Sequence, residues 1–281
     1  MVVSMLRHGR LGDGLDVLDL GTGAGGLAAY ASLRFGARHV TSLDVDSYVT
    51  KAAAERLAGF GLTPRFLVAD ATQEVPGAYD RIVSTVALPP GPGLRPVLGA
   101  LRDGGRLVTT LARTGVIITG WKRANGDVTG VVERSPAGFM SARSGADHPP
   151  PSVLAEAQAA DGEVISTGRY PVLDIPSTWE LRSMLEIAAP GVEATFHEEG
   201  RTRTALLVHS DGSWARATAE WTDPPTVHQR GPRRLWDVLE RIRTRLNIEG
   251  ALPLLGARVR ITPEGICHFS RGQWNAAVGA Q

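Results

Sequence analysis

The stretch Val17-Leu18-Asp19-Leu20-Gly21-Thr22-Gly23-Ala24-Gly25-Gly26 decides the fold of this 281-residue chain. Its short apolar run predicts a buried strand, and the glycines predict a tight turn because glycine adopts positive φ without a steric penalty. Residues 27–33 continue at helical spacing. Strand, glycine turn and helix are typical of a loop that presents free helix N–H groups to a nucleotide cofactor. A tight turn without a ligand is the alternative.

Two cofactor motifs overlap in this loop. Gly21, Gly23 and Gly26 satisfy G-x-G-x-x-G, which indicates a dinucleotide. Asp19, Gly21, Gly23 and Gly25 satisfy D-x-G-x-G-x-G, the first motif of S-adenosylmethionine (SAM) methyltransferases. The Asp19 carboxylate favours the second motif, since it would repel a pyrophosphate and suit the ammonium group of a methionine.

Composition limits the classes of protein. The chain has 43% hydrophobic residues, which support a real core, and a formal charge of +1, which gives no electrostatic signature of nucleic-acid or membrane binding. Its single cysteine, Cys267, excludes an internal disulfide and fits an apolar filler within a strand. The seven histidines show no metal-ligand spacing, so we expect no metal. No apolar run reaches transmembrane length and no signal-peptide core is present, so we expect a cytoplasmic protein.

Strand and helix signals alternate through the first part of the chain. This rhythm predicts an α/β fold with a parallel sheet and helices on both faces. The expected strands are residues 17–20, 39–43, 65–69, 79–86 and 106–111, and the expected helices are residues 27–35, 47–60 and 94–101.

The rhythm then changes to hairpins. Residues 116–121 and 128–132 flank Asn125-Gly126, a strong hairpin signal. Methyltransferase sheets usually end in such an antiparallel pair, whereas the sheets of dinucleotide dehydrogenases usually continue in parallel. Residues 148–151 read as a proline linker, and residues 259–262 and 266–269 as a closing hairpin.

Five motifs carry a resemblance to a known family. They are Asp19–Gly25, Ser42–Asp44, Ala69–Ala71, Tyr79–Ala87 and Gly104–Val108. In this order and spacing they resemble the class I SAM methyltransferases. The last two look most like protein-L-isoaspartate O-methyltransferase, and the likeness covers about residues 14–145.

The resemblance implies two domains. We expect a SAM-binding methyltransferase domain at residues 1–147, Rossmann-like with an antiparallel terminal hairpin, and a smaller α+β domain at residues 152–281 that recognises substrate. Residues 231–236 and 261–265 look similar to extended actinobacterial relatives, which modify ribosomally made peptides, including those cyclised by ATP-grasp ligases and certain lanthipeptides. The partner implied is therefore a peptide or protein carboxylate, such as an Asp or isoAsp in a precursor peptide.

Site roles follow from these motifs. Asp44 ends a strand where a carboxylate accepts both ribose hydroxyls. Asp70 is either an acceptor for the adenine amino group or a turn residue, and Asp46 is a helix cap. Thr85, Val86 and Ala87 either shape the acceptor pocket or pack at a strand end. The expected cofactor-binding residues are Asp19, Gly21, Thr22, Gly23, Ala24, Gly25, Asp44, Val45, Asp70 and Ala71.

The implied reaction is methyl transfer to a carboxylate oxygen. Because a carboxyl group of pKa ~4 is already ionised at neutral pH, the reaction needs no general base. Two alternatives stay open. The isoaspartyl enzymes carry a longer segment before the glycine loop than residues 1–18, which leaves room for a non-catalytic SAM-binding or adaptor protein. The G-x-G-x-x-G match alone supports an NAD-dependent oxidoreductase.

Overall fold

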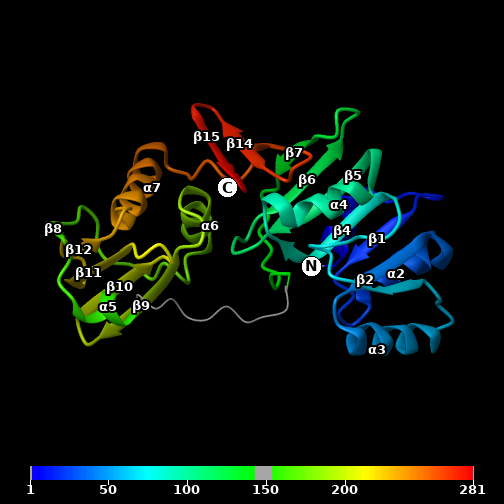
Figure 1. Cartoon of the computed structure of the whole chain (residues 1–281), viewed down its shortest axis with the longest axis horizontal. Coiled ribbons are helices and arrows are strands. Elements are labelled where there is room, and N and C mark those ends of the chain that lie inside the picture. Colours follow the sequence, from blue (N-terminus) through cyan, green and yellow to red (C-terminus); the bar gives the residue numbers. More distant parts are fainter. Residues whose placement is uncertain (1, 143–153, 281) are drawn as a thin grey trace. The chain divides into compact units, whose positions relative to one another are not determined.

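A computed structural model describes residues 2–142 and 154–280 of the chain. The chain divides into two compact units (Figure 1). Unit 1 comprises Met1–Ala146 together with Pro253–Gln281, and unit 2 comprises Asp147–Leu252. No helix of the described residues has the length and apolar character needed to cross a membrane.

Unit 1 is built on one sheet with the strand order β15-β14-β13-β7-β6-β5-β4-β1-β2-β3. Its parallel half consists of β1 (Val17–Leu20), β2 (Val40–Asp44), β3 (Arg65–Val68), β4 (Tyr79–Leu88) and β5 (Leu101–Leu111). Strand β1 lies between β2 and β4, so the order of the strands reverses there. Ligands of open α/β sheets bind at such a point, beyond the carboxyl ends of the strands. The Rossmann-like α/β sheet expected from the sequence is confirmed.

Helices pack on the parallel half of this sheet. They are α1 (Val2–Gly9), α2 (Gly26–Phe35), α3 (Ser47–Ala58) and α4 (Arg95–Ala100), with short 3-10 turns η1 (Ala37–His39) and η2 (Gly91–Leu94). Met5 of α1 and Leu27 of α2 are buried against Val83 and Val108 of the central strands. Helix α3 begins where Asp46 accepts hydrogen bonds from the N–H groups of the next turn, as expected for a cap.

An antiparallel extension follows β5. Strands β6 (Ile117–Lys122) and β7 (Val128–Val132) form the hairpin expected around Asn125-Gly126. Strands β13 (Arg258–Ile261), β14 (Cys267–Arg271) and β15 (Trp274–Val278) then complete the sheet, and β13 pairs with β7. Cys267 is fully buried in β14, as expected of an apolar filler.

The predicted boundary of the second domain is therefore wrong at its carboxyl end. Residues 253–281 were expected to belong with residues 152–252, yet they lie in the sheet of unit 1. The physical reason is that β7 would otherwise be an open sheet edge with unpaired backbone groups. The hairpin itself is a local signal, but its partner strand is distant in sequence and follows from no local pattern.

Unit 2 is a separate α+β body. Its antiparallel sheet has the order β8-β12-β11-β10-β9. The elements are α5 (Leu154–Ala159), β8 (Val164–Thr167), α6 (Trp179–Ala188), β9 (Glu193–Glu199), β10 (Thr202–Val208), β11 (Trp214–Glu220), β12 (Thr226–Arg230) and α7 (Leu235–Glu249). The buried side chain of Gln229 joins sheet to helix, since its oxygen accepts the Trp236 N–H at 2.9 Å.

The start of α6 departs from its local sequence signal. The sequence Ser177-Thr178-Trp179-Glu180 is typical of a capping box, but the N-cap residue of α6, Thr178, makes no side-chain cap hydrogen bond. The Thr178 hydroxyl instead donates to the Asp174 carbonyl, and the Asp174 carboxylate accepts the Ser177 N–H. The preceding turn therefore competes for the capping groups. The linker expected at residues 148–151 lies outside the described residues.

Candidate cofactor-binding site

A cavity of about 610 Å³ lies beyond the carboxyl ends of β1, β2, β3 and β4. Four strand ends and one distant segment, residues 140–142, form its walls. The lining residues are Leu20, Gly21, Gly23, Leu43, Asp44, Val45, Asp46, Ser47, Val49, Ala69, Asp70, Ala71, Thr85, Val86, Met140, Ser141 and Ala142. This is the switch point of the sheet, where the fold places a ligand.

The glycine loop reaches the cavity because its backbone passes close to neighbouring elements. Gly21 has φ +96°, and a Cβ added there would lie 2.5 Å from the Val86 side chain. Gly25 has φ +84°, and its added Cβ would lie 2.8 Å from Leu57. Neither position accepts another residue without strain, so the glycines are required by the path of the loop.

Asp44 has the geometry expected of a ribose ligand. Its Oδ2 accepts the Gly23 N–H at 3.2 Å, and its Oδ1 accepts the Asp46 N–H at 3.1 Å. These bonds orient the carboxylate at the cavity wall and leave each oxygen a further lone pair. This geometry fits the predicted ribose role of Asp44, which stays a prediction.

Asp70 stabilises a turn and also lines the cavity. Its Oδ1 accepts both the N–H of Thr72 at 2.9 Å and the Thr72 hydroxyl at 2.7 Å. The turn role considered from sequence is therefore observed. The adenine role of Asp70 stays a prediction. Its second carboxylate oxygen and the neighbouring Ala71 would serve that role.

Asp19 does not line the cavity, contrary to the direct contact expected from sequence. It is fully buried beneath the loop, where its Oδ2 accepts the Ser42 hydroxyl at 2.9 Å. The Ser42 and Thr22 hydroxyls are 2.8 Å apart, so Thr22 is also held below the surface. Burial raises the pKa of Asp19 to about 7, and the Ser42 hydrogen bond opposes this effect.

Ala24 and Gly25 are likewise absent from the cavity lining. Ala24 turns its carbonyl to the Arg56 guanidinium at 2.7 Å, and Gly25 packs on α3. Of the ten cofactor-binding residues expected from sequence, the structure brings six to the cavity wall. They are Gly21, Gly23, Asp44, Val45, Asp70 and Ala71.

The end of β4 faces the cavity only in part. Thr85 and Val86 line it, and the Thr85 hydroxyl donates to the Gly21 carbonyl at 3.0 Å. Ala87 is buried, and its backbone pairs with residues 140–142 through bonds of 2.9 and 2.8 Å. No local signal in the sequence marks this wall, because its pairing partner is more than fifty residues away along the chain.

The charge of the cavity lining favours a cationic cofactor over one that carries a diphosphate. Three carboxylates, Asp44, Asp46 and Asp70, line it, and no lysine, arginine or histidine does so among the described residues. A diphosphate would meet only like charge there, whereas an adenosyl sulfonium is cationic and offers hydroxyls and an amino group as donors. In the described part of the chain no group of three metal-ligating side chains occurs.

Comparisons with known proteins agree with this geometry. Residues 17–105 match the family model described as a methyltransferase domain. Residues 17–105 belong to a class I methyltransferase domain. SAM is the cofactor of this class, and the acidic cavity fits it. Protein-L-isoaspartate O-methyltransferase has a similar fold over 96% of this chain and 79% of its own, with a TM-score of 0.51 at 16% identity.

Curated relatives of the methyltransferase domain share only part of their length with the chain. The ribosomal protein L11 methyltransferase of Dechloromonas aromatica (strain RCB) is 38% identical over 92 residues, which cover 32% of this chain and 30% of that protein. The ribosomal RNA small subunit methyltransferase C of Pseudomonas entomophila (strain L48) is 38% identical over 93 residues, covering 28% of each. The shared length is thus under a third, so the acceptors of these relatives are not carried over.

Proposed function

We propose that this protein transfers a methyl group from SAM to a carboxylate oxygen of an aspartyl or isoaspartyl residue in a peptide or protein. The acidic lining of the cavity, with Asp44 at its wall, carries the cofactor half of the proposal. The acceptor half rests on the strand and glycine motifs at Tyr79–Ala87 and Gly104–Val108, and the fold likeness to the isoaspartyl enzyme is compatible with it.

The chemistry needs positioning more than proton transfer. A bond forms between the acceptor oxygen and the methyl carbon while the carbon–sulfur bond breaks and its electron pair stays on sulfur. The products are a methyl ester and S-adenosylhomocysteine. Thr85 holds the end of β4 against the glycine loop, and Val86 supplies an apolar wall that excludes water from the acceptor oxygen.

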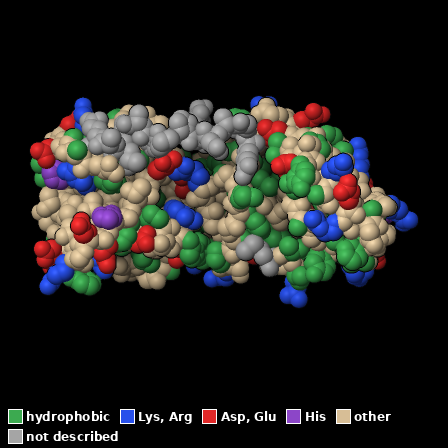
Figure 2. All heavy atoms as spheres, turned by 90° about the horizontal axis from the view of Figure 1, so that it is seen from below, with side chains coloured by type: hydrophobic (Ala, Val, Ile, Leu, Met, Phe, Trp, Pro, Cys, Tyr) green, Lys and Arg blue, Asp and Glu red, His purple; other side chains and the backbone are tan. Residues whose placement is uncertain are grey.

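The distribution of surface charge fits a protein or peptide acceptor. On the face shown in Figure 2, positive and negative side chains are interspersed over both units, without the single-sign region typical of nucleic-acid binding. Within the proposal, unit 2 recognises the peptide, as in the extended relatives that modify ribosomally made peptides.

Calorimetry with S-adenosylhomocysteine tests the cofactor half. We expect binding by the wild type and at least a tenfold weaker Kd for Asp44→Ala, because hydrogen bonds to a charged group contribute about 1.5–3 kcal/mol. Asp103→Asn changes an exposed carboxylate outside the cavity and is the matched control. Equal affinity of Asp44→Ala and wild type would disprove the ribose role, and displacement by NAD would favour the oxidoreductase alternative.

Tritiated methyl transfer tests the acceptor half. With a cyclised aspartate-containing peptide and an isoaspartyl peptide as acceptors, we expect label that base releases as methanol, since esters hydrolyse in base. Base-stable label would exclude an ester. Tight S-adenosylhomocysteine binding without any turnover would instead support the non-catalytic alternative.

A further inference from the structure

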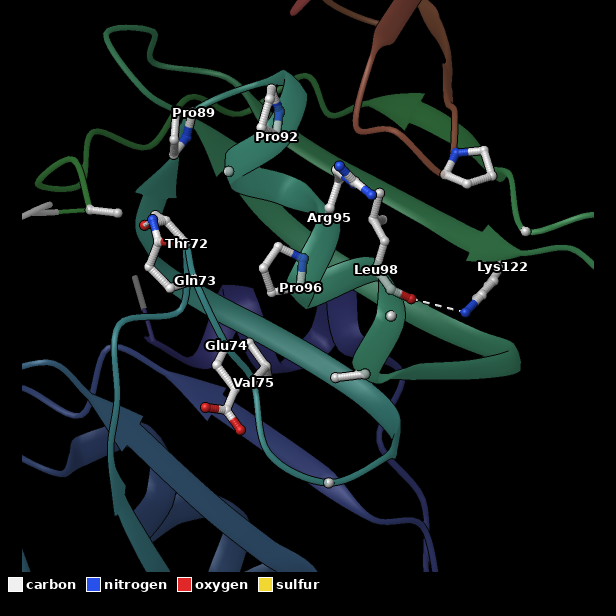
Figure 3. Close-up of a pocket in the computed structure, with 17 residues that line it drawn as sticks. Thr72, Gln73, Glu74, Val75, Pro89, Pro92, Arg95, Pro96, Leu98 and Lys122 are labelled. Carbon is white, nitrogen blue, oxygen red and sulfur yellow. Dashed lines mark hydrogen bonds between the residues drawn. The ribbon is translucent and has the colours of Figure 1, made fainter.

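A second cavity of unit 1, of about 950 Å³, lies along α4 (Figure 3). Residues 72–77 form one wall, and α4 with the preceding proline loop forms the other. We call it the α4 groove. None of the cofactor-binding residues expected from sequence lines it.

The α4 groove exists because a covering helix is missing. Successive parallel strands of such sheets are usually joined by a crossover that contains a helix, which covers the sheet face. Here residues 69–78 join β3 to β4 without helical structure. This loop, and no helix, forms the wall of the α4 groove that faces α4.

The α4 groove has the dimensions of an extended chain. Its lining runs from Gly77 and Ala100, which precede β4 and β5, to Pro89, which follows β4. Because the ten residues of β4 rise roughly 3.3 Å each, the groove spans about 30 Å, the length of about nine extended residues. Its prolines, Pro89, Pro92, Pro96 and Pro263, make rigid walls without N–H groups.

The α4 groove borders the cofactor cavity. Ala142 lines both, and it is held in place by its backbone bond to Ala87 at the end of β4. The two walls carry opposite charges, with Glu74 on one and Arg95 on the other, so they suit a peptide with its own polar side chains. The Lys122 ammonium is already bound by the carbonyls of Leu98 and Leu101.

We propose that the α4 groove binds the acceptor peptide as an extended segment whose carboxylate side chain enters the cofactor cavity past Ala142. This inference rests on the proposed function and adds the acceptor's binding site. The match of length, the rigid proline walls and the shared residue favour an extended peptide over a compact small molecule, which would not need a groove of this length.

The test fills the α4 groove without disturbing the fold. Gly99 lies on its wall, and a Cβ added there meets nothing within 4 Å, so Gly99→Trp places an indole in the groove. Gln73→Trp does the same from the opposite, exposed wall. Gly59→Trp is the matched control, because Gly59 is exposed at the end of α3 and lines neither cavity.

Each full-length variant is given tritiated SAM and a synthetic pool of undecapeptides with random residues around a central isoaspartate or aspartate. We expect base-labile labelling to fall at least tenfold for Gly99→Trp and Gln73→Trp and to stay within twofold for Gly59→Trp. The S-adenosylhomocysteine Kd of all variants should stay within threefold of wild type. If one groove variant loses S-adenosylhomocysteine binding, the labelling by the other groove variant tests the inference.

Three results would overturn the inference. Labelling of the pool by both groove variants at the wild-type rate would show that the acceptor binds elsewhere. A wild-type protein that binds S-adenosylhomocysteine but labels only intact folded proteins, or a non-peptide acceptor, would exclude an extended peptide as the occupant. Failure of the wild type to bind S-adenosylhomocysteine would reject the proposed function itself.

Discussion

Asp19 and Asp44 are carboxylates on neighbouring strands with opposite surroundings. Asp44 is half-buried at the cavity wall and is oriented by two backbone N–H groups. Asp19 is fully buried, and its Oδ1 has no hydrogen-bond partner in the described structure. At the residue scale, therefore, Asp44 is placed to meet a ligand, while Asp19 supports the loop from below through Ser42 and Thr22.

The buried Asp19 predicts a specific pH dependence. Its pKa rises from 3.8 to about 7 because of burial, so between these values the folded state holds a proton that the unfolded state has lost. The free energy of unfolding should therefore fall as the pH rises from about 4 to 7 and then level off, a change on the order of 4 kcal/mol.

Urea unfolding of the ligand-free protein between pH 4.5 and 8 measures this dependence. Asp19→Asn cannot ionise, so we expect its stability to fall less over this range and to exceed that of the wild type at pH 8. Asp103→Asn, at an exposed carboxylate outside the loop, is the matched control. Parallel curves for Asp19→Asn and wild type would contradict the assignment.

At the element scale, the glycine loop and the strand starts anchor the parallel sheet from its two ends. Gly21 and Gly26 lie in one loop and differ in constraint. An alanine Cβ at Gly21 meets Val86 at a positive φ, whereas one at Gly26 meets nothing within 4 Å. The two positions therefore form a matched pair for testing the path of the loop.

Gly21→Ala should weaken S-adenosylhomocysteine binding at least tenfold, because left-handed backbone costs an alanine about 1–2 kcal/mol and the clash adds to this. Gly26→Ala should bind within twofold of wild type and gain up to about 1 kcal/mol of stability, since alanine favours a helix. Calorimetry and thermal unfolding measure both effects. Equal losses in the two variants would argue against a steric cause.

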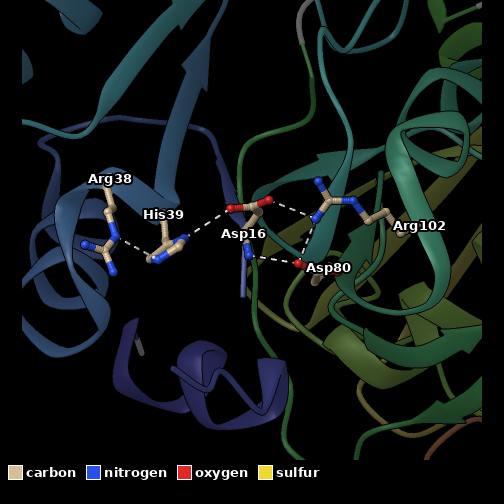
Figure 4. Close-up of polar contacts among 5 residues, drawn as sticks. All are labelled: Asp16, Arg38, His39, Asp80 and Arg102. Atoms are coloured by element: carbon tan, nitrogen blue, oxygen red, sulfur yellow. Dashed lines mark hydrogen bonds and ion pairs between the residues drawn. The ribbon is translucent and has the colours of Figure 1, made fainter. Parts of the chain in front are cut away.

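At the opposite ends of the strands, a polar cluster joins β1, β2, β4 and β5 (Figure 4). The Arg102 guanidinium lies 2.9 Å from Asp16 and 2.8 Å from Asp80, and Asp16 also lies 3.2 Å from His39. Asp80 lies at the start of β4 beside Arg81, yet its carboxylate pairs with the distant Arg102. Arg102 comes from the start of β5, which no local pattern brings to Asp80.

Arg102→Gln should lower stability by up to about 1 kcal/mol, a small effect because the cluster is partly exposed. The hydrogen bonds from Arg102 and then His39 lower the pKa of Asp16. Its contribution is present above the unfolded pKa of 3.8 and is lost as the pH falls through the lowered value. Urea unfolding should therefore show a smaller difference between Arg102→Gln and wild type at pH 2.5 than at pH 7. Arg38→Gln, which removes only a contact to His39, is the control.

At the scale of the whole molecule, the chain leaves unit 1, forms unit 2 and returns to complete the first sheet. The returning strands bury Val259, Ile261, Cys267 and Phe269. Burial of four such side chains contributes roughly 6–12 kcal/mol as an upper value. Residues 253–281 therefore contribute to the stability of unit 1.

A chain that ends at Leu252 should lose S-adenosylhomocysteine binding and aggregate, because β7 becomes an open edge and unit 1 loses these contacts. A chain that ends at Gly272 removes only the outermost strand and should retain binding. Calorimetry and light scattering distinguish them. Wild-type binding by the shorter chain would place the segment outside unit 1, as first expected from the sequence.

The sequence by itself determined the parallel half of the sheet, the glycine loop, Asp44 at the end of β2 and the hairpin at Asn125-Gly126. Each of these depends on hydrophobic periodicity or turn chemistry within a few residues. Only the tertiary structure decided that Asp19 is buried, that residues 140–142 wall the cavity and that β13 pairs with β7. These features depend on contacts between residues far apart in the chain, and local spacing carries no information about which distant partner is chosen.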